Sequence, residues 1–356
     1  MNPINILITG SGAPGAPGII KSLRNNGERQ IFIVGVDINP ENSGVSLVDK
    51  FFSIPKPTNN DFIYKILNIS IKNNIQVILP LVTRELLVLS RNIEKFRRHT
   101  IHLAISSAKD LAIANNKAKL MTFLKEHSIP TPQFTVVNSL TEFKQAVRLL
   151  GYPDKRVCFK PPVSNGSRGF RIIDDSIDQM DLLLKYKPNT TFISYQNIIE
   201  ILSKADNFPE LVVMEYLPGD EYSIDLLVNH GKPLYTIPRF RHVIKAGISS
   251  VGSVIKNDEI IEYCNNIVEN LKLHGNIGIQ VKADENGQYK ILEINPRVQG
   301  TIVLCTASGV NLPYLGIKLA MGESIPTDFD IRWGIKMFRF YDEVYMDENR
   351  EFFKYD

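Results

Sequence analysis

Four side chains within residues 276–297 are of the types that bind metal ions and phosphates, namely Gln280, Glu293, Asn295 and Arg297. Glu293 and Asn295 are two residues apart, so on a strand their side chains share one face. Amide and carboxylate oxygens suit Mg²⁺ ions that bridge the phosphates of a nucleotide. This grouping predicts a phosphoryl-transfer site. A half-solvated hairpin also turns polar residues outward, and the stretch alone does not separate the two interpretations.

A hairpin must position these groups. Two runs of alternating apolar residues flank Asn286-Gly287, the dipeptide favoured in a two-residue type I′ turn. With that dipeptide as the loop, Glu285 faces Gln288. Counting back along both strands then places Gln280 opposite Glu293, with their Cβ atoms roughly 5 Å apart.

Composition bounds the class of protein. The chain has 356 residues, enough for two or three domains, and 44% of them are hydrophobic. A net charge of +3 is too small to favour nucleic acid or an anionic membrane as a partner. Cys158, Cys264 and Cys305 show no zinc or disulfide spacing, so we expect reduced core thiols. The N-terminus lacks a signal-peptide pattern and no stretch is long enough to span a membrane, so we expect a cytoplasmic protein.

The first part of the chain alternates strand-like and helix-like segments with short connections. This order predicts a parallel sheet with helices on both faces. The glycine-rich turn at residues 10–15 follows the first strand, and Asp37 follows the second, which is formally the dinucleotide-binding pattern. Prolines make this turn unusual, so we favour a turn that packs strand against helix over a nicotinamide site. Glu85 follows a later strand, where it suits either a ligand or the first turn of a helix.

A second glycine- and serine-rich turn, at residues 163–169, joins two predicted strands. Backbone N–H groups in such a turn can hold phosphates, and Lys160 at the end of the preceding strand can neutralise them. A flexible hairpin tip explains the same composition. A helical pattern over 107–128 and a rigid Ile-Pro-Thr-Pro link at 129–132 precede this region.

Basic residues are concentrated before another small-residue turn, at Arg239, Arg241, His242 and Lys245. Arginines so grouped can bind a carboxylate or phosphate through paired hydrogen bonds. Ordinary exposure along a strand is an equally good interpretation.

Three segments taken together resemble the ATP-grasp superfamily, in the branch related to the carbamoyl-phosphate synthase large subunit and amino-acid ligases. They are CFKPPVSNGSRGF, VVMEYLPGDEYSIDLLV and IGIQVKADENGQYKILEINPR, in that order. The resemblance implies an α/β chain with a Rossmann-like preATP-grasp domain followed by a two-subdomain α+β ATP-grasp fold. The implied boundaries are residues 1–112 for the first domain, 113–208 and 209–325 for the two subdomains, and 326–356 for a tail that packs back on the core.

The resemblance assigns nucleotide-binding roles to matching residues. Lys119 and Lys160 would contact the phosphates of ATP, beneath a flap that includes Gly166, Ser167 and Gly169. The helical motif around Lys119 is loose, so its assignment is the least secure.

The hinge and ribose contacts follow from the second segment. Glu215, Tyr216 and Leu217 would read adenine, largely through the backbone, and Glu221 would hold the ribose hydroxyls.

The third segment would supply metal ligands and a catalytic arginine. Gln280, Glu293 and Asn295 would ligate one or two Mg²⁺ ions, or Mn²⁺ in their place, and Arg297 would stabilise the transferring phosphoryl group together with Lys160. Many relatives carry an acid at the position of Gln280, which puts the strength of that metal bond in doubt.

The implied activity is an ADP-forming carboxylate–amine ligase that proceeds through an acyl phosphate. Its substrates would be a small carboxylate and an amine, amino acids among them, with Arg239 and Arg241 as carboxylate anchors and a homodimer as the assembly. The alternatives are carbamoyl-phosphate-synthase-like carboxyphosphate chemistry, a nicotinamide oxidoreductase and a non-catalytic nucleotide-binding regulator.

Overall fold

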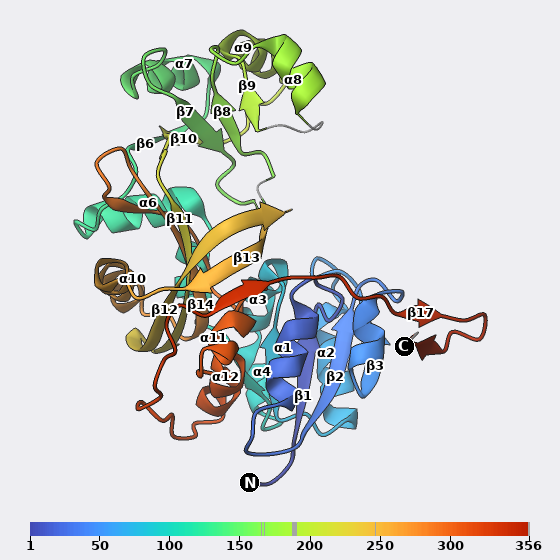
Figure 1. Ribbon diagram of the computed structural model, residues 1–356. Coiled ribbons are helices and arrows are strands. Elements are labelled where there is room, and N and C mark those ends of the chain that lie inside the picture. Colours follow the sequence, from blue (N-terminus) through green and yellow to red (C-terminus); the bar gives the residue numbers. More distant parts are fainter. Residues whose placement is uncertain (165, 167, 187–190, 246, 355–356) are drawn as a thin grey trace. The chain divides into compact units, whose positions relative to one another are not determined.

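The computed structural model describes residues 1–164, 166, 168–186, 191–245 and 247–354 (Figure 1). The chain folds into two compact units, each built from separate stretches of sequence. The first unit comprises Met1–Ala114, Tyr222–Gln280 and Ile294–Asp356, and the second comprises Asn115–Glu221 and Val281–Glu293.

The first unit opens with a five-stranded parallel sheet in the order β3-β2-β1-β4-β5. Its central strands are buried on both faces and consist almost wholly of apolar residues, as a parallel sheet between helices requires. The predicted parallel sheet is therefore confirmed. The strands are β1 (Ile4–Thr9), β2 (Ile31–Asp37), β3 (Lys50–Ser53), β4 (Val77–Pro80) and β5 (His102–Leu103).

Helices cover both faces of this sheet. The face with Ile6 and Ile8 packs against α1 and α12, whereas the face with Leu7 and Val34 packs against α2 to α5. The helices of this unit are α1 (Ala16–Arg24), the short 3₁₀ helix η1 (Ser43–Leu47), α2 (Phe62–Lys72), α3 (Thr83–Arg91), α4 (Ile93–Arg97), α5 (Ala108–Ala114), α10 (Asp258–Leu271), α11 (Val303–Ala307) and α12 (Leu312–Ala320). Among the described residues, no helix has the length and apolar character needed to cross a bilayer.

A six-stranded sheet follows in the order β15-β14-β11-β12-β13-β16. The division into units cuts three of its strands, after Glu221, Gln280 and Glu293. Its strands are β11 (Glu221–Asn229), β12 (Lys232–Lys245), β13 (Ile248–Val254), β14 (Gly275–Ala283), β15 (Tyr289–Asn295) and β16 (Lys336–Phe338).

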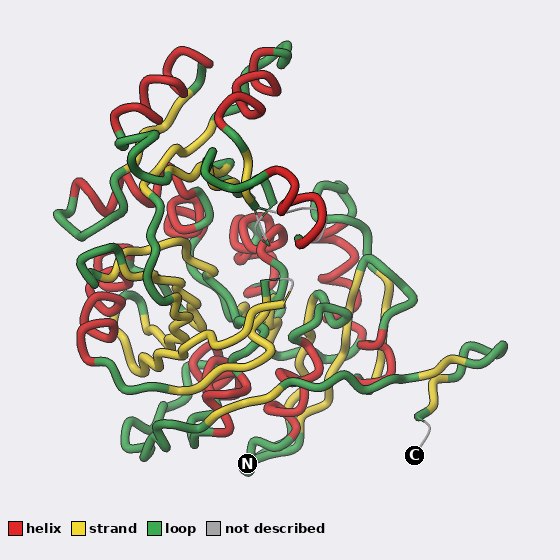
Figure 2. Tube along the Cα trace, turned by 45° about the horizontal axis from the view of Figure 1, so that its top comes forward, coloured by secondary structure: helices red, strands yellow, loops and turns green. Residues whose placement is uncertain are grey.

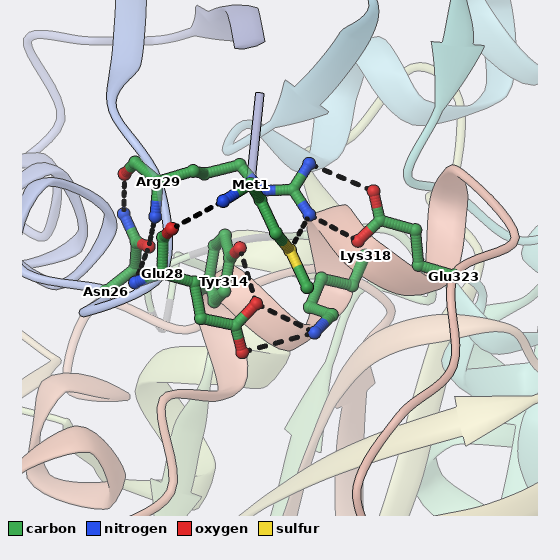
Figure 3. Close-up of polar contacts among 7 residues, drawn as sticks. All are labelled: Met1, Asn26, Glu28, Arg29, Tyr314, Lys318 and Glu323. Carbon is green, nitrogen blue, oxygen red and sulfur yellow. Dashed lines mark hydrogen bonds and ion pairs between the residues drawn. The ribbon is translucent and has the colours of Figure 1, made fainter. Parts of the chain in front are cut away.

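Ion pairs join α12 and the segment after it to the loop before β2 (Figure 3). Lys318 Nζ lies 2.9 Å from Glu28 Oε2, and Arg29 Nη2 lies 2.6 Å from Glu323 Oε2. Tyr314 donates a hydrogen bond to the Glu28 carboxylate. The bond from Lys318, then that from Tyr314, lowers the pKa of Glu28 despite its opposing desolvation. This network fixes the C-terminal helix on the first domain.

The second unit contains a five-stranded sheet in the order β6-β10-β7-β8-β9. Helices α7 and α9 pack against it and close a separate apolar core. Its elements are α6 (Lys117–Glu126), β6 (Phe134–Val137), α7 (Leu140–Leu149), β7 (Val157–Lys160), β8 (Arg171–Ile173), α8 (Gln179–Lys185), β9 (Phe192–Ile193), α9 (Tyr195–Ser203) and β10 (Leu211–Glu215).

The turn between β14 and β15 differs from the predicted type I′ loop. Asp284, not Glu285, pairs with Gln288, through a backbone bond of 2.9 Å. Asp284 Oδ1 also accepts the N–H groups of Asn286 and Gln288, which stabilises a three-residue loop. Of the two central residues predicted, only Gly287 has a positive φ, 83°, whereas type I′ requires both. The predicted facing of Glu285 and Gln288 is therefore wrong.

Candidate functional site

Two buried lysines of the second unit lie beside residues of β15. Lys160, at the end of β7, donates from Nζ to the carbonyl oxygen of Leu292 at 2.9 Å. Lys117 Nζ lies 3.5 Å from Glu293 Oε2 and 2.9 Å from the carbonyl oxygen of Ser164. Desolvation, helped by the charge of Lys117, lowers the pKa of Lys160 to about 8. Such a cluster of buried cations is suited to binding an anion.

The prediction selected Lys119 from this helix, but the structure places Lys119 on the exposed face and Lys117 inside. The reason is a helix break. The helical pattern over 107–128 is two helices, and the Asn116 side chain caps the second by accepting from the N–H of Lys119. That cap makes Lys117 the first helical residue, and the Asn-Asn pair before it is the sequence signal for the break.

The predicted flap retains its glycine geometry. Gly166 and Gly169 have positive φ values of 62° and 76°. A Cβ on Gly169 would lie 2.6 Å from Pro161 Cδ, so a larger residue would displace the turn. Ser167 lies outside the described residues.

The predicted adenine hinge begins at the last residue of β10, Glu215, whose carboxylate is already bound by neighbouring groups. Glu215 Oε1 accepts from Lys290 Nζ at 2.6 Å and from the N–H of Gln133 at 3.1 Å. Lys290 also lies 3.1 Å from Asp284. Because the carboxylate is engaged in this way, a nucleotide would meet the hinge backbone and not the Glu215 side chain.

The other hinge residues are positioned by packing. The Tyr216 ring lies 4.9 Å from Lys282 Nζ, a cation–π contact. Leu217 is buried, and Glu221 is half-buried at the start of β11.

The first unit contains a cavity of about 170 Å³. It is lined by the glycine-rich turn at residues 13–16 together with Arg241, Gln280, Asn295 and Arg297. Three residues predicted from the hairpin and one from the basic cluster are thus brought to one cavity. Glu293 belongs to the second unit, where it contacts Lys117.

The Arg297 guanidinium is fixed from several sides. Its Nε donates to Thr83 Oγ1 at 3.0 Å, its Nη1 to the carbonyl of Val298 at 2.8 Å, and its Nη2 lies 3.4 Å from Asn295 Oδ1. Thr83 is the first residue of α3, just after β4. The arginine is therefore held at the carboxyl edge of the N-terminal parallel sheet, where ligands of such sheets bind.

The two predicted carboxylate anchors differ in their surroundings. Arg239 is fully buried, and its Nε lies 2.5 Å from Asp225 Oδ2 while its Nη2 donates to Gln299. Arg241 lines the cavity, where its Nε donates to Ser249. The sequence analysis did not identify Asp225 as the partner of Arg239.

Two family models match separate parts of this chain. Residues 207–338 match the family described as ATP-grasp in the biosynthetic pathway with Ter operon. This part of the chain is similar to ATP-grasp proteins. Residues 6–104 match the PylC-like, N-terminal domain. The predicted resemblance to ATP-grasp proteins and the predicted N-terminal domain before it are confirmed.

Similarity to proteins of known activity is distant. The carbamoyl phosphate synthase large chain of Clostridium acetobutylicum is 22% identical over 243 residues, which are 65% of this chain and 21% of that protein. This chain therefore spans about a fifth of the length of that relative.

Solved structures share the fold of this chain. One is the biotin carboxylase domain dimer of 2-oxoglutarate carboxylase from Hydrogenobacter thermophilus, in complex with MgADP, ADP and bicarbonate. It is 19% identical with a TM-score of 0.66, covering 93% of this chain and 73% of that one. Another is an L-amino acid ligase from Bacillus licheniformis, 15% identical with a TM-score of 0.63, covering 89% and 74%. The predicted fold class is confirmed.

The donor chemistry of the predicted metal ligands fits Mg²⁺. Gln280 and Asn295 offer amide oxygens and Glu293 a carboxylate, all of them hard ligands. The described residues include no cluster of three His, Cys, Asp or Glu side chains suited to a metal. With one carboxylate in the set, much of the coordination would come from nucleotide phosphates and water, as is usual for Mg²⁺.

Proposed function

We propose that this chain is an ATP- and Mg²⁺-dependent carboxylate–amine ligase that forms an amide through an acyl phosphate and releases ADP. The observation that carries the proposal is the cavity of the first unit, which gathers Arg241, Asn295 and Arg297. The family match to ATP-grasp proteins supports the nucleotide, and the cluster of Lys117, Lys160 and Glu293 supports phosphate binding in the second unit.

The chemistry needs little from the protein beyond alignment and charge. A carboxylate is a poor acyl donor because its leaving group would be oxide. Here one carboxylate oxygen forms a bond to the γ-phosphorus of ATP as the bond to ADP breaks. The amine then attacks the acyl carbon, inorganic phosphate leaves with the electron pair, and the amine proton passes to solvent. No protein nucleophile takes part.

Each residue has a defined task in this reaction. Lys117 and Lys160 would hold ATP phosphates as charge-assisted donors. Arg297, fixed by Thr83, would face the charge that develops on the transferring phosphoryl group. Bound Mg²⁺ would neutralise phosphate charge, held by Glu293 with the two amide ligands. Arg241 would bind the substrate carboxylate.

The glycine-rich turn contributes to the substrate cavity and not to a nicotinamide site. Gly12 N–H donates to Asp37 Oδ2 and the N–H of Asn39 donates to Oδ1. Both oxygens of the acid that would hold a ribose are therefore occupied by backbone. A cytoplasmic location and a homodimer remain parts of this proposal.

A second candidate is carboxyphosphate chemistry, in which bicarbonate takes the place of the organic acid. The similarity to a carbamoyl phosphate synthase large chain favours it. The same cavity would then hold a smaller anion.

One assay separates these reactions. Purified protein is incubated with ATP, Mg²⁺, hydroxylamine as a generic amine and pools of carboxylic acids, while hydroxamate, ADP and AMP are followed. Hydroxamate formed together with ADP supports the acyl-phosphate ligase. ADP release that depends on bicarbonate, without hydroxamate, replaces it with carboxyphosphate chemistry. The variant Glu293→Gln is the inactive control, and ATP binding without turnover by any acid would favour a regulator.

A further inference from the structure

Residues 336–354, the C-terminal arm, leave the body of the first unit as an extended segment. The arm begins with β16, continues without regular structure and ends in the hairpin of β17 (Tyr345–Met346) and β18 (Phe352–Phe353). Both views show the tip of this hairpin pointing away from the rest of the unit (Figures 1 and 2), whereas β18 contacts η1. The family match ends at residue 338, so most of the arm lies beyond it.

The arm exposes about as much aromatic surface as the largest apolar patch on an ordinary monomer. Phe338, Phe340 and Tyr341 are 68%, 82% and 81% exposed, and Tyr345 and Phe353 are about half exposed. At roughly 150–250 Å² for each aromatic side chain, these five expose roughly 600 Å². That is the upper end of the largest apolar patch on a typical monomer, and close to the roughly 800 Å² that each partner contributes to a stable complex.

The backbone of the same segment is available for pairing at its outer edge. Strand β16 is the last strand of the six-stranded sheet. The N–H of Arg339 donates to the carbonyl of Ser250 in β13, and the carbonyl of Ile335 accepts from the N–H of Val254. Because antiparallel ladders alternate, odd-numbered residues face β13, and the N–H and C=O groups of Phe338 and Phe340 face outward.

The sequence of this edge is complementary to itself in antiparallel pairing. With the pairing centred on Arg339, Phe338 of one copy lies opposite Phe340 of the other, and Lys336 lies opposite Asp342. These four residues alternate along the strand and all are exposed, so they share one face. Aromatic pairs and opposite charges directly across a ladder stabilise it.

The other charged groups near Arg339, the centre of this pairing, do not prevent the register. Arg339 is half-buried, and its Nη2 donates to the carbonyl of Gly300 in its own chain at 3.0 Å. The ion pair between Lys354 and Asp342 is exposed on both sides, so it is weak enough to exchange.

We propose that a second copy of this chain binds the C-terminal arm, with the outer edges of residues 336–342 pairing antiparallel across a two-fold axis centred on Arg339. The same patch serves both subunits, as a two-fold interface requires. Two such arms would join the six-stranded sheets edge to edge and pack the exposed Phe338 and Phe340 side chains of one arm against those of the other.

Mass in solution tests the assembly. Sedimentation velocity of the full chain should give twice the chain mass of 40.3 kDa, in a concentration-dependent equilibrium. The double variant with Phe338→Ser and Phe340→Ser should give the single mass. A wild-type chain that stays monomeric at every concentration, or a variant that stays dimeric, overturns the proposal.

Helix α8 offers a matched control. Leu183 and Leu184 are 73% and 72% exposed, so Leu183→Ser with Leu184→Ser removes a similar amount of exposed apolar side chain elsewhere. This control should keep the double mass. Equal dissociation of both double variants would show non-specific association and overturn the proposal.

Cross-linking tests the register. Cys158, Cys264 and Cys305 are all buried, so introduced surface cysteines should dominate disulfide formation. A mixture of Phe338→Cys and Phe340→Cys chains should give a reducible band at twice the chain mass, because directly opposite residues of a hydrogen-bonded pair have Cα atoms roughly 5.5 Å apart, within the range of a disulfide. Either variant alone should give much less. Equal yields from all three samples, or none from the mixture, would overturn the register.

Phe338 and Phe340 do not line the cavity, so the hydroxamate assay measures catalysis independently of the dimer. The dissociated arm variant should keep its turnover. Loss of activity together with loss of the dimer would mean that the arm acts on the site, contrary to this assignment.

Discussion

Lys117 Nζ lies 3.5 Å from Glu293 Oε2, which joins the first turn of α6 to the predicted metal-binding strand β15. Lys119 extends from the same helix into solvent. Lys117 and Lys119 are two residues apart on one helix, but Lys117 is buried and Lys119 is exposed. A substitution at Lys119 therefore serves as the control for the same substitution at Lys117.

We predict that Lys117→Met raises the KM for ATP roughly 10- to 100-fold, the effect of losing one charge-assisted hydrogen bond. Lys119→Met should leave the KM unchanged. Steady-state kinetics with hydroxylamine as the amine would measure both. A stronger effect of Lys119→Met would restore the residue that the sequence favoured.

The sequence predicts the order of motifs well and the local breaks poorly. Apolar periodicity and the spacing of Glu293, Asn295 and Arg297 are sufficient to place a strand and its polar face. The choice between Lys117 and Lys119 depends on whether the helix pauses at Asn116, a matter of about 1 kcal/mol in capping. Helical periodicity runs through such a break without a visible change.

The same limit applies to the hairpin and the arginines. Asn286-Gly287 favours a two-residue loop, but the Asp284 side chain stabilises a three-residue one, and only the folded backbone reveals that competition. Arg239 and Arg241 are equivalent in the sequence because both lie on one strand face. Their difference arises from Asp225, which is distant in sequence and becomes a neighbour through the pairing of β11 with β12.

We predict that Lys160→Met stabilises the ligand-free protein and abolishes ATP binding. The pKa of Lys160 is lowered from 10.5 to about 8, so the fold disfavours its charge. Burying the charged amine therefore lowers the free energy of unfolding. This loss of stability is fully present below pH 8 and disappears as pH rises toward 10.5, because between these values only the unfolded chain keeps the proton. The cost of burying the charged amine is on the order of 3 kcal/mol.

Thermal melting and ATP titration would measure the two effects. Wild-type affinity for ATP should also weaken as pH rises through 8, since the neutral amine loses its charge-assisted bond. A Lys160→Met protein that melts at a lower temperature than the wild type and still binds ATP would contradict both the predicted stabilisation and the predicted loss of binding.

The two arginines should separate stability from substrate binding. Arg239→Met leaves Asp225 buried without its partner, so we expect a loss of roughly 3–5 kcal/mol in the free energy of unfolding. Arg241→Met should keep that free energy within about 1 kcal/mol and raise the KM for the carboxylate far more than that for ATP. Denaturant unfolding and kinetics with each substrate varied would decide. If Arg241→Met raised both KM values equally, Arg241 would belong with the nucleotide.

Glu85 should make stability depend on pH near neutrality. It is buried in the first turn of α3, and desolvation raises the pKa of its carboxyl to about 7, with the charge of Asp37 contributing and the hydrogen bond from Thr9 opposing. Because the folded state holds the proton more tightly, the stabilisation of the fold by the protonated carboxyl is fully present below pH 4.5 and is lost as pH rises through about 7.

Glu85→Gln replaces the neutral acid with an amide of nearly the same shape. We therefore expect both proteins to melt at similar temperatures at pH 5, and the wild type to melt several degrees lower than Glu85→Gln at pH 8. Parallel curves for the two proteins across this range would show that Glu85 does not titrate there, and a buried partner for its carboxylate would then have to be found.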